Sequence, residues 1–244
     1  EINKVLTKRK SNATGPDTIH NKMLANISPT NRKFLRHLFN ILLFHGITPQ
    51  AWKEATIIPI LKTNKQPNDP TSFHPISLTS CLGKIMERVI NNRLSWHLET
   101  RNLLQPTQAG SRPGRSTIDH IISLENDAMM GFSNKLSTFV VFLDIAKAYD
   151  RTNTNGVFFK LSKMSVKGKI LKWIKSFLTE RTAKVRVGNQ FSDAHTLTKE
   201  VPQGAVLSPT LFNVMMSDLP KPPRSITTLT YADDVAIYTK AKTA

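Results

Sequence analysis

The sequence contains one cysteine, no long apolar run and few acidic residues. Cys81 is the only cysteine among 244 residues, so no disulfide can form within the chain, which fits a reducing compartment. One cysteine and seven histidines show no zinc-finger spacing, and we predict no structural zinc. No apolar run approaches the roughly 18 residues of a membrane-spanning helix. The N-terminus also lacks the apolar core of a signal peptide. We expect no membrane partner.

The scarcity of acidic residues leaves a large positive charge. Lysine and arginine number 34 against 17 aspartates and glutamates, which gives a net charge of +17 and a pI near 10.2. Such an excess is typical of proteins that bind a polyanion, most often nucleic acid. Two alternatives are a basic protein without such a partner and one that binds an anionic membrane surface. However, the basic residues are spread along the chain and form no juxtamembrane cluster.

Two adjacent aspartates, Asp233 and Asp234, lie between two short stretches at residues 227–230 and 235–239. Both stretches are rich in β-branched and aromatic residues, which predicts two strands joined by a tight turn. Neighbouring carboxylates repel each other, and a metal cation is the usual reason that a chain tolerates them. The alternative is a solvated Asp-Asp turn.

A third aspartate strengthens the metal interpretation. Asp144 ends the apolar run at residues 138–143, which we expect to be a buried strand. Two carboxylate sites on strands that are far apart in sequence can converge on a pair of magnesium ions. Such a pair clamps the attacking and leaving oxygens of a phosphoryl transfer.

Three stretches, in this order, resemble the motifs of reverse transcriptases. They are FLDIAKAYD at residues 142–150, VPQGAVLSP at 201–209 and YADD at 231–234. The pattern is similar to that of non-LTR (LINE-like, jockey- or CR1-type) retrotransposons, a class of transposable element. The resemblance covers nearly the whole chain and implies an RNA-directed DNA polymerase, which is a nucleotidyltransferase. It also implies that Asp144, Asp233 and Asp234 hold two Mg²⁺ ions, with Mn²⁺ as a possible substitute.

The resemblance implies further site residues. Lys62, Arg112, Tyr149 and Gln203 would contact the nucleotide, with Tyr149 under its sugar, and Gly204, Tyr231 and Arg115 would contact the template–primer. Arg112 and Arg115 lie in QAGSRPGRST at residues 108–117, a turn before a helix with a predicted capping box at Ser116 and Asp119. Backbone amides at a helix start suit a phosphate. A capped surface turn is the alternative.

The implied fold is an α+β right-hand polymerase with fingers, a palm and an antiparallel catalytic sheet. We expect a fingers-like region with a helical N-terminal part, and part of the palm, at residues 1–135, and the palm at 136–244. Since the sequence stops ten residues after Asp234, we expect the thumb and the endonuclease in other segments of a full-length element. The implied partners are an RNA template, a DNA primer and deoxynucleoside triphosphates. The implied location is intracellular, in the nucleus at the site of reverse transcription.

A second hypothesis is a catalytically inactive retroelement remnant that only binds nucleic acid. It rests on three observations: His74 stands where the family usually has arginine, the sequence ends soon after the YADD hairpin, and residues 152–155 replace a hydrophobic run that contains tryptophan. Against it, all three aspartates are present. The two hypotheses differ in metal-dependent nucleotide incorporation, and both predict salt-sensitive binding to polyanions.

Apolar spacing predicts several elements around these motifs. Residues 55–61 and 73–78 are predicted to form a fingers hairpin, and residues 183–189 to begin a second hairpin. Ser208 is predicted to cap a helix at residues 210–217. Further helices are predicted at residues 31–45, 80–99, 117–130, 157–164 and 169–178.

Overall fold

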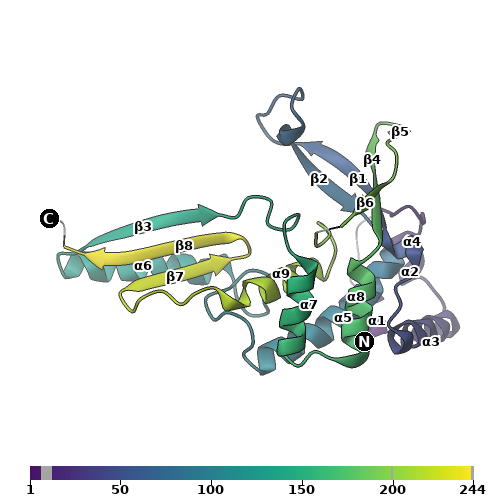
Figure 1. The fold of residues 1–244 in the computed structure, drawn as a ribbon, viewed down its shortest axis with the longest axis horizontal. Coiled ribbons are helices and arrows are strands. Elements are labelled where there is room, and N and C mark those ends of the chain that lie inside the picture. The colour runs from purple at the N-terminus through teal and green to yellow at the C-terminus, as the bar shows by residue number, and fades with distance from the viewer. Residues whose placement is uncertain (7–12, 199, 243–244) are drawn as a thin grey trace. The chain divides into compact units, whose positions relative to one another are not determined.

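The structure, a computed structural model, describes residues 1–6, 13–198 and 200–242 (Figure 1). The chain divides into two compact units. The first consists of Glu1–Leu94 and Tyr149–Ser208, and the second of Ser95–Ala148 and Pro209–Ala244. Each unit is thus built from two separate segments of the chain. The predicted division into fingers and palm after residue 135 stays a prediction.

Helices make up most of the first unit. The longest helix confined to this unit is α3 (Pro29–His45). Ser28 caps its start, because the Ser28 side chain accepts a hydrogen bond from the Asn31 amide. Gly46, in a left-handed conformation, ends the helix. Trp173 and Ile174 of this unit are fully buried. The other helices that lie in this unit or begin in it are α1 (Ile2–Leu6), α2 (Asn21–Ala25), α4 (Gln50–Lys53), α5 (Cys81–Thr100), α7 (Thr154–Lys163) and α8 (Gly168–Leu178).

The sheet of the first unit has the strand order β2-β1-β4-β5, with β6 paired to β4. The predicted fingers hairpin is confirmed, because β1 (Glu54–Leu61) and β2 (Phe73–Leu78) pair antiparallel across a loop that contains η1 (Pro70–Ser72). β4 (Arg181–Val187) begins the second hairpin with β5 (Gln190–Phe191), and β6 is His195–Leu197. The pairing of β1 with β4 is parallel. This pair was not predicted, since local periodicity carries no information about which distant strands meet.

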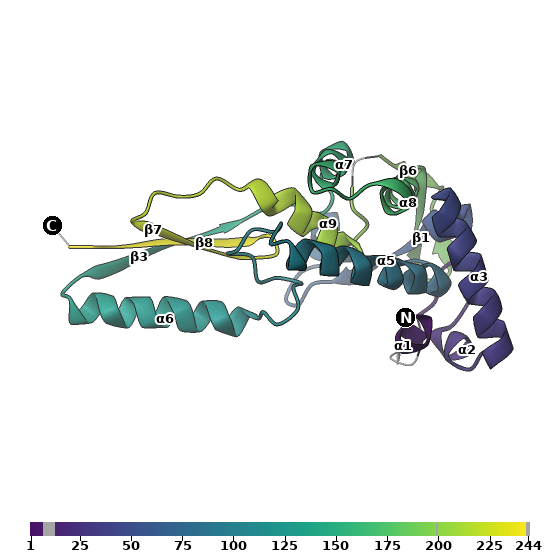
Figure 2. The same cartoon turned by 90° about the horizontal axis from the view of Figure 1, so that it is seen from below.

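The second unit contains the predicted antiparallel sheet, with the order β3-β8-β7. Its strands are β3 (Ser137–Asp144), β7 (Ile226–Tyr231) and β8 (Asp234–Ala241), and Figure 2 shows α6 (Thr117–Ser133) along one face of them. Asp127 of α6 accepts hydrogen bonds from the Tyr238 hydroxyl at 2.7 Å and from Lys240 at 2.6 Å. The capping box at Ser116 and Asp119 is confirmed. Helix α9 (Ser208–Met215) continues into η2 (Met216–Asp218).

Two local predictions were wrong. The strand that ends at Asp144 was expected to be buried, but Phe142 is 74% exposed and Val141 is 56% exposed. The reason is that β3 is the edge strand of a sheet with three strands among the described residues. Ser208 was expected to cap a helix, yet the helix already includes it, and its hydroxyl donates a hydrogen bond to the Pro202 carbonyl at 2.7 Å.

Among the described residues, no helix is both long and apolar enough to cross a membrane.

Candidate active site

The three predicted catalytic aspartates lie at one end of the β3-β8-β7 sheet. Tyr231 pairs with Asp234 across β7 and β8, so Ala232 and Asp233 form a two-residue hairpin turn. Asp234 is also the partner of Asp144 across β3 and β8. Residues directly opposite each other in an antiparallel pair have Cβ atoms about 4.5–5.5 Å apart on the same face. The register therefore brings Asp144 and Asp234 together, with Asp233 adjacent in the turn.

These carboxylates lack any neutralising side chain in the described part of the chain. Among the described residues, none forms a hydrogen bond or an ion pair with the side-chain carboxylate of Asp144, Asp233 or Asp234. Carboxylate oxygens are the ligands that Mg²⁺ and Mn²⁺ prefer, so the donor set fits such an ion chemically. Among the described residues, no three or more Asp, Glu, His or Cys side chains are arranged so that they could hold a metal ion. The site thus supplies the right donors without a complete coordination shell.

A pocket of about 360 Å³ lies beside the aspartates in the same unit. Asp144, Asp234 and Tyr231 line one part of it, and His120 and Ile121 from the first turns of α6 line another. Burial lowers the pKa of His120, against the opposing effect of Asp119. The neutral imidazole is therefore favoured, and most of the pocket wall is apolar.

The first unit contains Lys62, Tyr149 and Gln203, three of the four residues that the family resemblance places at the nucleotide. Gln203 donates a hydrogen bond to Asp150 at 2.8 Å, and the Val201 amide donates one to the Tyr149 carbonyl at 3.1 Å. The stretches that contain Tyr149 and Gln203 therefore lie side by side. Gly204 has φ of +86°, a conformation that favours glycine, and a Cβ there would lie 3.3 Å from the Ser77 carbonyl.

The fingers hairpin places Lys62 directly after β1. The Lys62 ammonium donates to the Thr71 carbonyl at 2.9 Å, within the hairpin loop. His74 faces Ile60 in the register of β1 and β2 and is exposed.

Arg112 and Arg115 differ in their surroundings. Arg112 is buried, and its guanidinium forms a two-pronged ion pair with Glu99, at 2.6 and 2.8 Å, and donates to the Gln105 and Gln108 carbonyls. These contacts favour a structural role for Arg112 over the predicted contact with a nucleotide. Arg115 is exposed and donates to the Pro106 and Gln108 carbonyls.

The comparisons with known proteins decide the family. Residues 60–244 match the reverse transcriptase (RNA-dependent DNA polymerase) family. The chain belongs to this family. Reverse transcriptases generally use divalent metal ions, in agreement with the chemistry of the three aspartates.

The curated relatives of this reverse transcriptase are enzymes of non-LTR retrotransposons, which confirms the type that the motifs indicate. The chain is 37% identical to the RNA-directed DNA polymerase from mobile element jockey of Drosophila melanogaster, over 94% of this chain and 26% of that protein. It is 35% identical to the probable RNA-directed DNA polymerase from transposon BS of the same species, over 91% of this chain and 25% of that protein. The chain thus spans about a quarter of the length of these relatives.

Two solved telomerase structures show the same fold at low sequence identity. Apo telomerase from Candida tropicalis aligns with a TM-score of 0.56 and 15% identity over 90% of this chain and 53% of that one. Telomerase from Candida albicans, in complex with a fragment of telomeric RNA, aligns with a TM-score of 0.56 and 12% identity over 85% of this chain and 41% of that one. This likeness confirms the predicted polymerase fold with fingers and palm.

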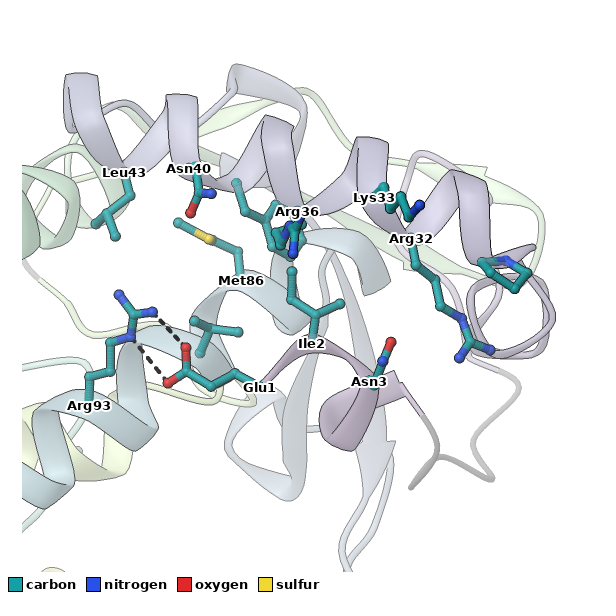
Figure 3. A pocket seen from close by; sticks show the side chains of 13 residues that line it. Glu1, Ile2, Asn3, Arg32, Lys33, Arg36, Asn40, Leu43, Met86 and Arg93 are labelled. Atoms are coloured by element: carbon teal, nitrogen blue, oxygen red, sulfur yellow. Dashed lines mark hydrogen bonds and ion pairs between the residues drawn. The ribbon is translucent and has the colours of Figure 1, made fainter.

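The first unit of this reverse transcriptase also has a basic cavity of about 630 Å³ near the N-terminus (Figure 3). Arg32, Lys33 and Arg36 of α3 and Arg93 of α5 contribute its positive charge. Arg93 forms an ion pair with Glu1 at 2.6 Å, and Arg32 donates to the carbonyls of Ala25 and Ile27. Lys33 and Arg36 remain without a partner among the described residues, which suits a polyanion.

Sequence reasoning missed several residues that support the site. Gln108 lies in the QAGSRPGRST stretch, but no role was predicted for it; its side chain forms hydrogen bonds with Ala232, in the turn that contains Asp233. Glu87 of α5 accepts hydrogen bonds from the amides of Val206 and Leu207, and burial raises its pKa. Burial and Asp150 raise the pKa of Glu200, while Arg181 opposes the shift. No pattern in the sequence marks the two glutamates.

Proposed function

We propose that this chain is the fingers and palm part of a retrotransposon RNA-directed DNA polymerase and that it extends a DNA primer on an RNA template. The observation that carries the proposal is the strand register that sets Asp144 opposite Asp234, with Asp233 beside it in the turn. Family membership and the retrotransposon relatives support the same reaction. The proposed substrates are deoxynucleoside triphosphates, and the proposed location is the nucleus, where the element integrates.

In the proposed mechanism, Asp144, Asp233 and Asp234 hold two Mg²⁺ ions, for which Mn²⁺ can substitute. The bound ions supply Lewis-acid stabilisation of the attacking primer 3′-oxygen and of the leaving pyrophosphate. Lys62 steadies the triphosphate, and Tyr149 and Gln203 hold the sugar, as the family motifs imply. Gly204, Tyr231 and Arg115 contact the template–primer. The chain therefore contributes positioning and charge neutralisation, which are the main requirements of phosphoryl transfer.

Primer extension on an RNA template tests this proposal. Asp233→Asn keeps the size and shape of the side chain and removes one metal-binding charge. We expect extension to fall roughly 1,000-fold or more, because metal ions stabilise this transition state by several kcal/mol and each ~1.4 kcal/mol is worth tenfold in rate. Asp193→Asn, at an exposed aspartate in the other unit, is the matched control and should extend like the wild type.

The outcome also separates the two hypotheses. Mg²⁺-dependent extension by the wild type that is lost in Asp233→Asn supports the polymerase. Salt-sensitive binding to the primed template without any extension, in Mg²⁺ or Mn²⁺, would instead support a remnant that only binds nucleic acid. Equal extension by Asp233→Asn and the wild type would refute the metal assignment.

A further inference from the structure

The turn that contains the catalytic Asp233 has an unfavourable backbone conformation. Of its two residues, only Ala232 has a positive φ, of 55°. A two-residue hairpin turn of this kind usually has glycine at its first position, because a Cβ is disfavoured there. Such a conformation persists only where surrounding groups hold it. Since Ala232 directly precedes Asp233, its conformation determines the direction of both catalytic carboxylates on the hairpin.

The side chain of Gln108 holds this turn by both polar groups of Ala232. The Ala232 amide donates to Gln108 Oε1 at 2.8 Å, and Gln108 Nε2 donates to the Ala232 carbonyl at 3.0 Å. A primary amide is the side-chain group that offers an acceptor and a donor side by side in this way. Gln108 is 1% exposed, so water does not compete for these bonds.

Gln108 is itself held in place. Its Oε1 also accepts the Gly110 amide at 2.8 Å, and its carbonyl accepts from Arg112 at 3.2 Å. The backbone around it lies along the edge of β7, where the Ala109 amide donates to the Thr230 carbonyl at 2.8 Å and the Thr230 amide donates to the Thr107 carbonyl at 3.1 Å. We call the pair of hydrogen bonds between the Gln108 side chain and Ala232 the clamp. It is anchored on β7, the strand that leads into the turn.

Gly110 completes the contact by leaving room for it. A Cβ at this position would lie 2.3 Å from the Ala232 nitrogen and 3.0 Å from Gln108 Oε1. Any other residue would therefore displace the turn or the clamp. The Gly110 carbonyl accepts a hydrogen bond from Asn213 of α9 at 2.8 Å, so a second element holds this backbone.

We propose that Gln108 is a positioning residue of the polymerase, which acts with Gly110 to hold the strained Ala232 turn and so aims Asp233 and Asp234 at the metal ions. This inference rests on the proposed function. Neither residue touches substrate or metal in this assignment. Loss of the clamp lets the turn relax, so that the aspartates bind the ions less tightly and in poorer geometry.

The test compares Gln108→Ala with the wild type in Mg²⁺-titrated primer extension. Because a misplacement of about 1 Å can cost roughly 100-fold in rate, we expect kcat to fall by that order and the Mg²⁺ concentration for half-maximal rate to rise several-fold. KM for the deoxynucleotide should stay within about twofold, since that interaction is not altered. Amide hydrogen exchange at Ala232, measured by NMR on the same proteins, should be faster in the variant.

Two further variants guard against a general loss of structure. Gln108→Glu keeps the length of the side chain and its acceptor but replaces the donor to the Ala232 carbonyl with an oxygen, so it should show the same Mg²⁺ shift even if Gln108→Ala folds poorly. Gln105→Ala is the matched control, because this glutamine of the same loop bonds to the Leu219 carbonyl, away from the turn. It should keep the wild-type Mg²⁺ dependence.

The outcomes separate this inference from the function on which it rests. A Mg²⁺ shift in both Gln108 variants, with faster exchange at Ala232 and an unchanged Gln105→Ala, supports the clamp. If the wild type extends primers and the Gln108 variants show the same Mg²⁺ dependence, the clamp is overturned while the polymerase stands. If the wild type does not extend at all, the proposed function fails, and the clamp has no catalytic role to play.

Discussion

The guanidinium of Arg112 shows how a single buried side chain organises a loop of this chain. Its four hydrogen bonds reach both carboxylate oxygens of Glu99 and the carbonyls of Gln105 and Gln108. A lysine could not replace it, because a flexible point charge lacks the planar fork that makes paired contacts. The motif suggested that Arg112 contacts a phosphate, whereas its burial and bonds indicate that it supports the segment containing Gln108.

The Glu99 pair gives a prediction about stability and pH. The hydrogen bond from Arg112 lowers the pKa of Glu99 below its ordinary 4.5. A lowered carboxyl pKa stabilises the fold above the ordinary pKa, and this stabilisation is lost as the pH falls through the lowered value. We expect Glu99→Gln to reduce the free energy of unfolding by about 1–3 kcal/mol at pH 7, because charged hydrogen bonds are lost.

Urea denaturation at pH 7 and in acid checks this prediction. The deficit of Glu99→Gln should shrink as the pH falls from 4.5 through the lowered pKa, below which the wild-type carboxyl is neutral in the folded state as well. The control is Glu1→Gln, which breaks the ion pair of Glu1 with Arg93 at 2.6 Å, in which both side chains are exposed, and should change stability by only about 0–1 kcal/mol. An equally large effect of both substitutions would contradict the role of the buried pair.

Among the elements, α5 fixes the segment that leads from the Gln203 loop into α9. Glu87 of α5 accepts the amides of Val206 and Leu207 at 2.7 and 3.3 Å through one carboxylate oxygen. Burial raises the pKa of Glu87, and it outweighs these hydrogen bonds and the positive charges of Arg181 and Lys84, which lower it. A buried acid therefore lies behind a loop that the family places beside the nucleotide.

Glu87→Gln tests this element. The variant keeps an oxygen that can accept both amides but cannot ionise. The raised pKa of Glu87 stabilises the fold at low pH, where the carboxyl is protonated. This stabilisation is lost as the pH rises from the ordinary pKa of 4.5 through the raised pKa. The wild type therefore loses stability over this pH range, whereas the variant, which cannot ionise at this position, does not. We expect the difference in unfolding free energy to move in favour of Glu87→Gln as the pH rises, measured by urea denaturation from pH 4 to 8. Parallel pH profiles of the two proteins would disprove the assignment.

For the molecule as a whole, we expect the net charge of +17 to dominate the proposed binding of nucleic acid. Neutralising phosphates releases counterions, so binding to a primed RNA template should weaken steeply with salt. If six to ten phosphates are contacted, affinity should fall about 10³–10⁵-fold between roughly 50 and 200 mM salt, as fluorescence anisotropy can measure. Asp233→Asn should keep this slope, because it changes catalysis and leaves the basic surface intact. A salt-independent affinity would argue against a polyanion partner.

The sequence by itself determined the local elements and predicted the chemistry of the candidate site. Helix α5, the fingers hairpin and the β7–β8 hairpin follow from apolar spacing and β-branched runs, whose information lies within a few residues. The three aspartates could be predicted because metal chemistry restricts which residues can stand at such positions. Their motifs, in order along the chain, identified a reverse transcriptase of the non-LTR type, which the comparisons confirm.

Only the tertiary structure decided which distant groups meet. The parallel pairing of β1 with β4, the exposure of Phe142 and the burial of Arg112 depend on neighbours that no local pattern specifies. The bond between Gln108 and Ala232 joins residues 124 positions apart. Hydrogen bonds of this kind depend on distances of a few tenths of an ångström, which arise from the packing of whole segments and leave no periodic trace in the sequence.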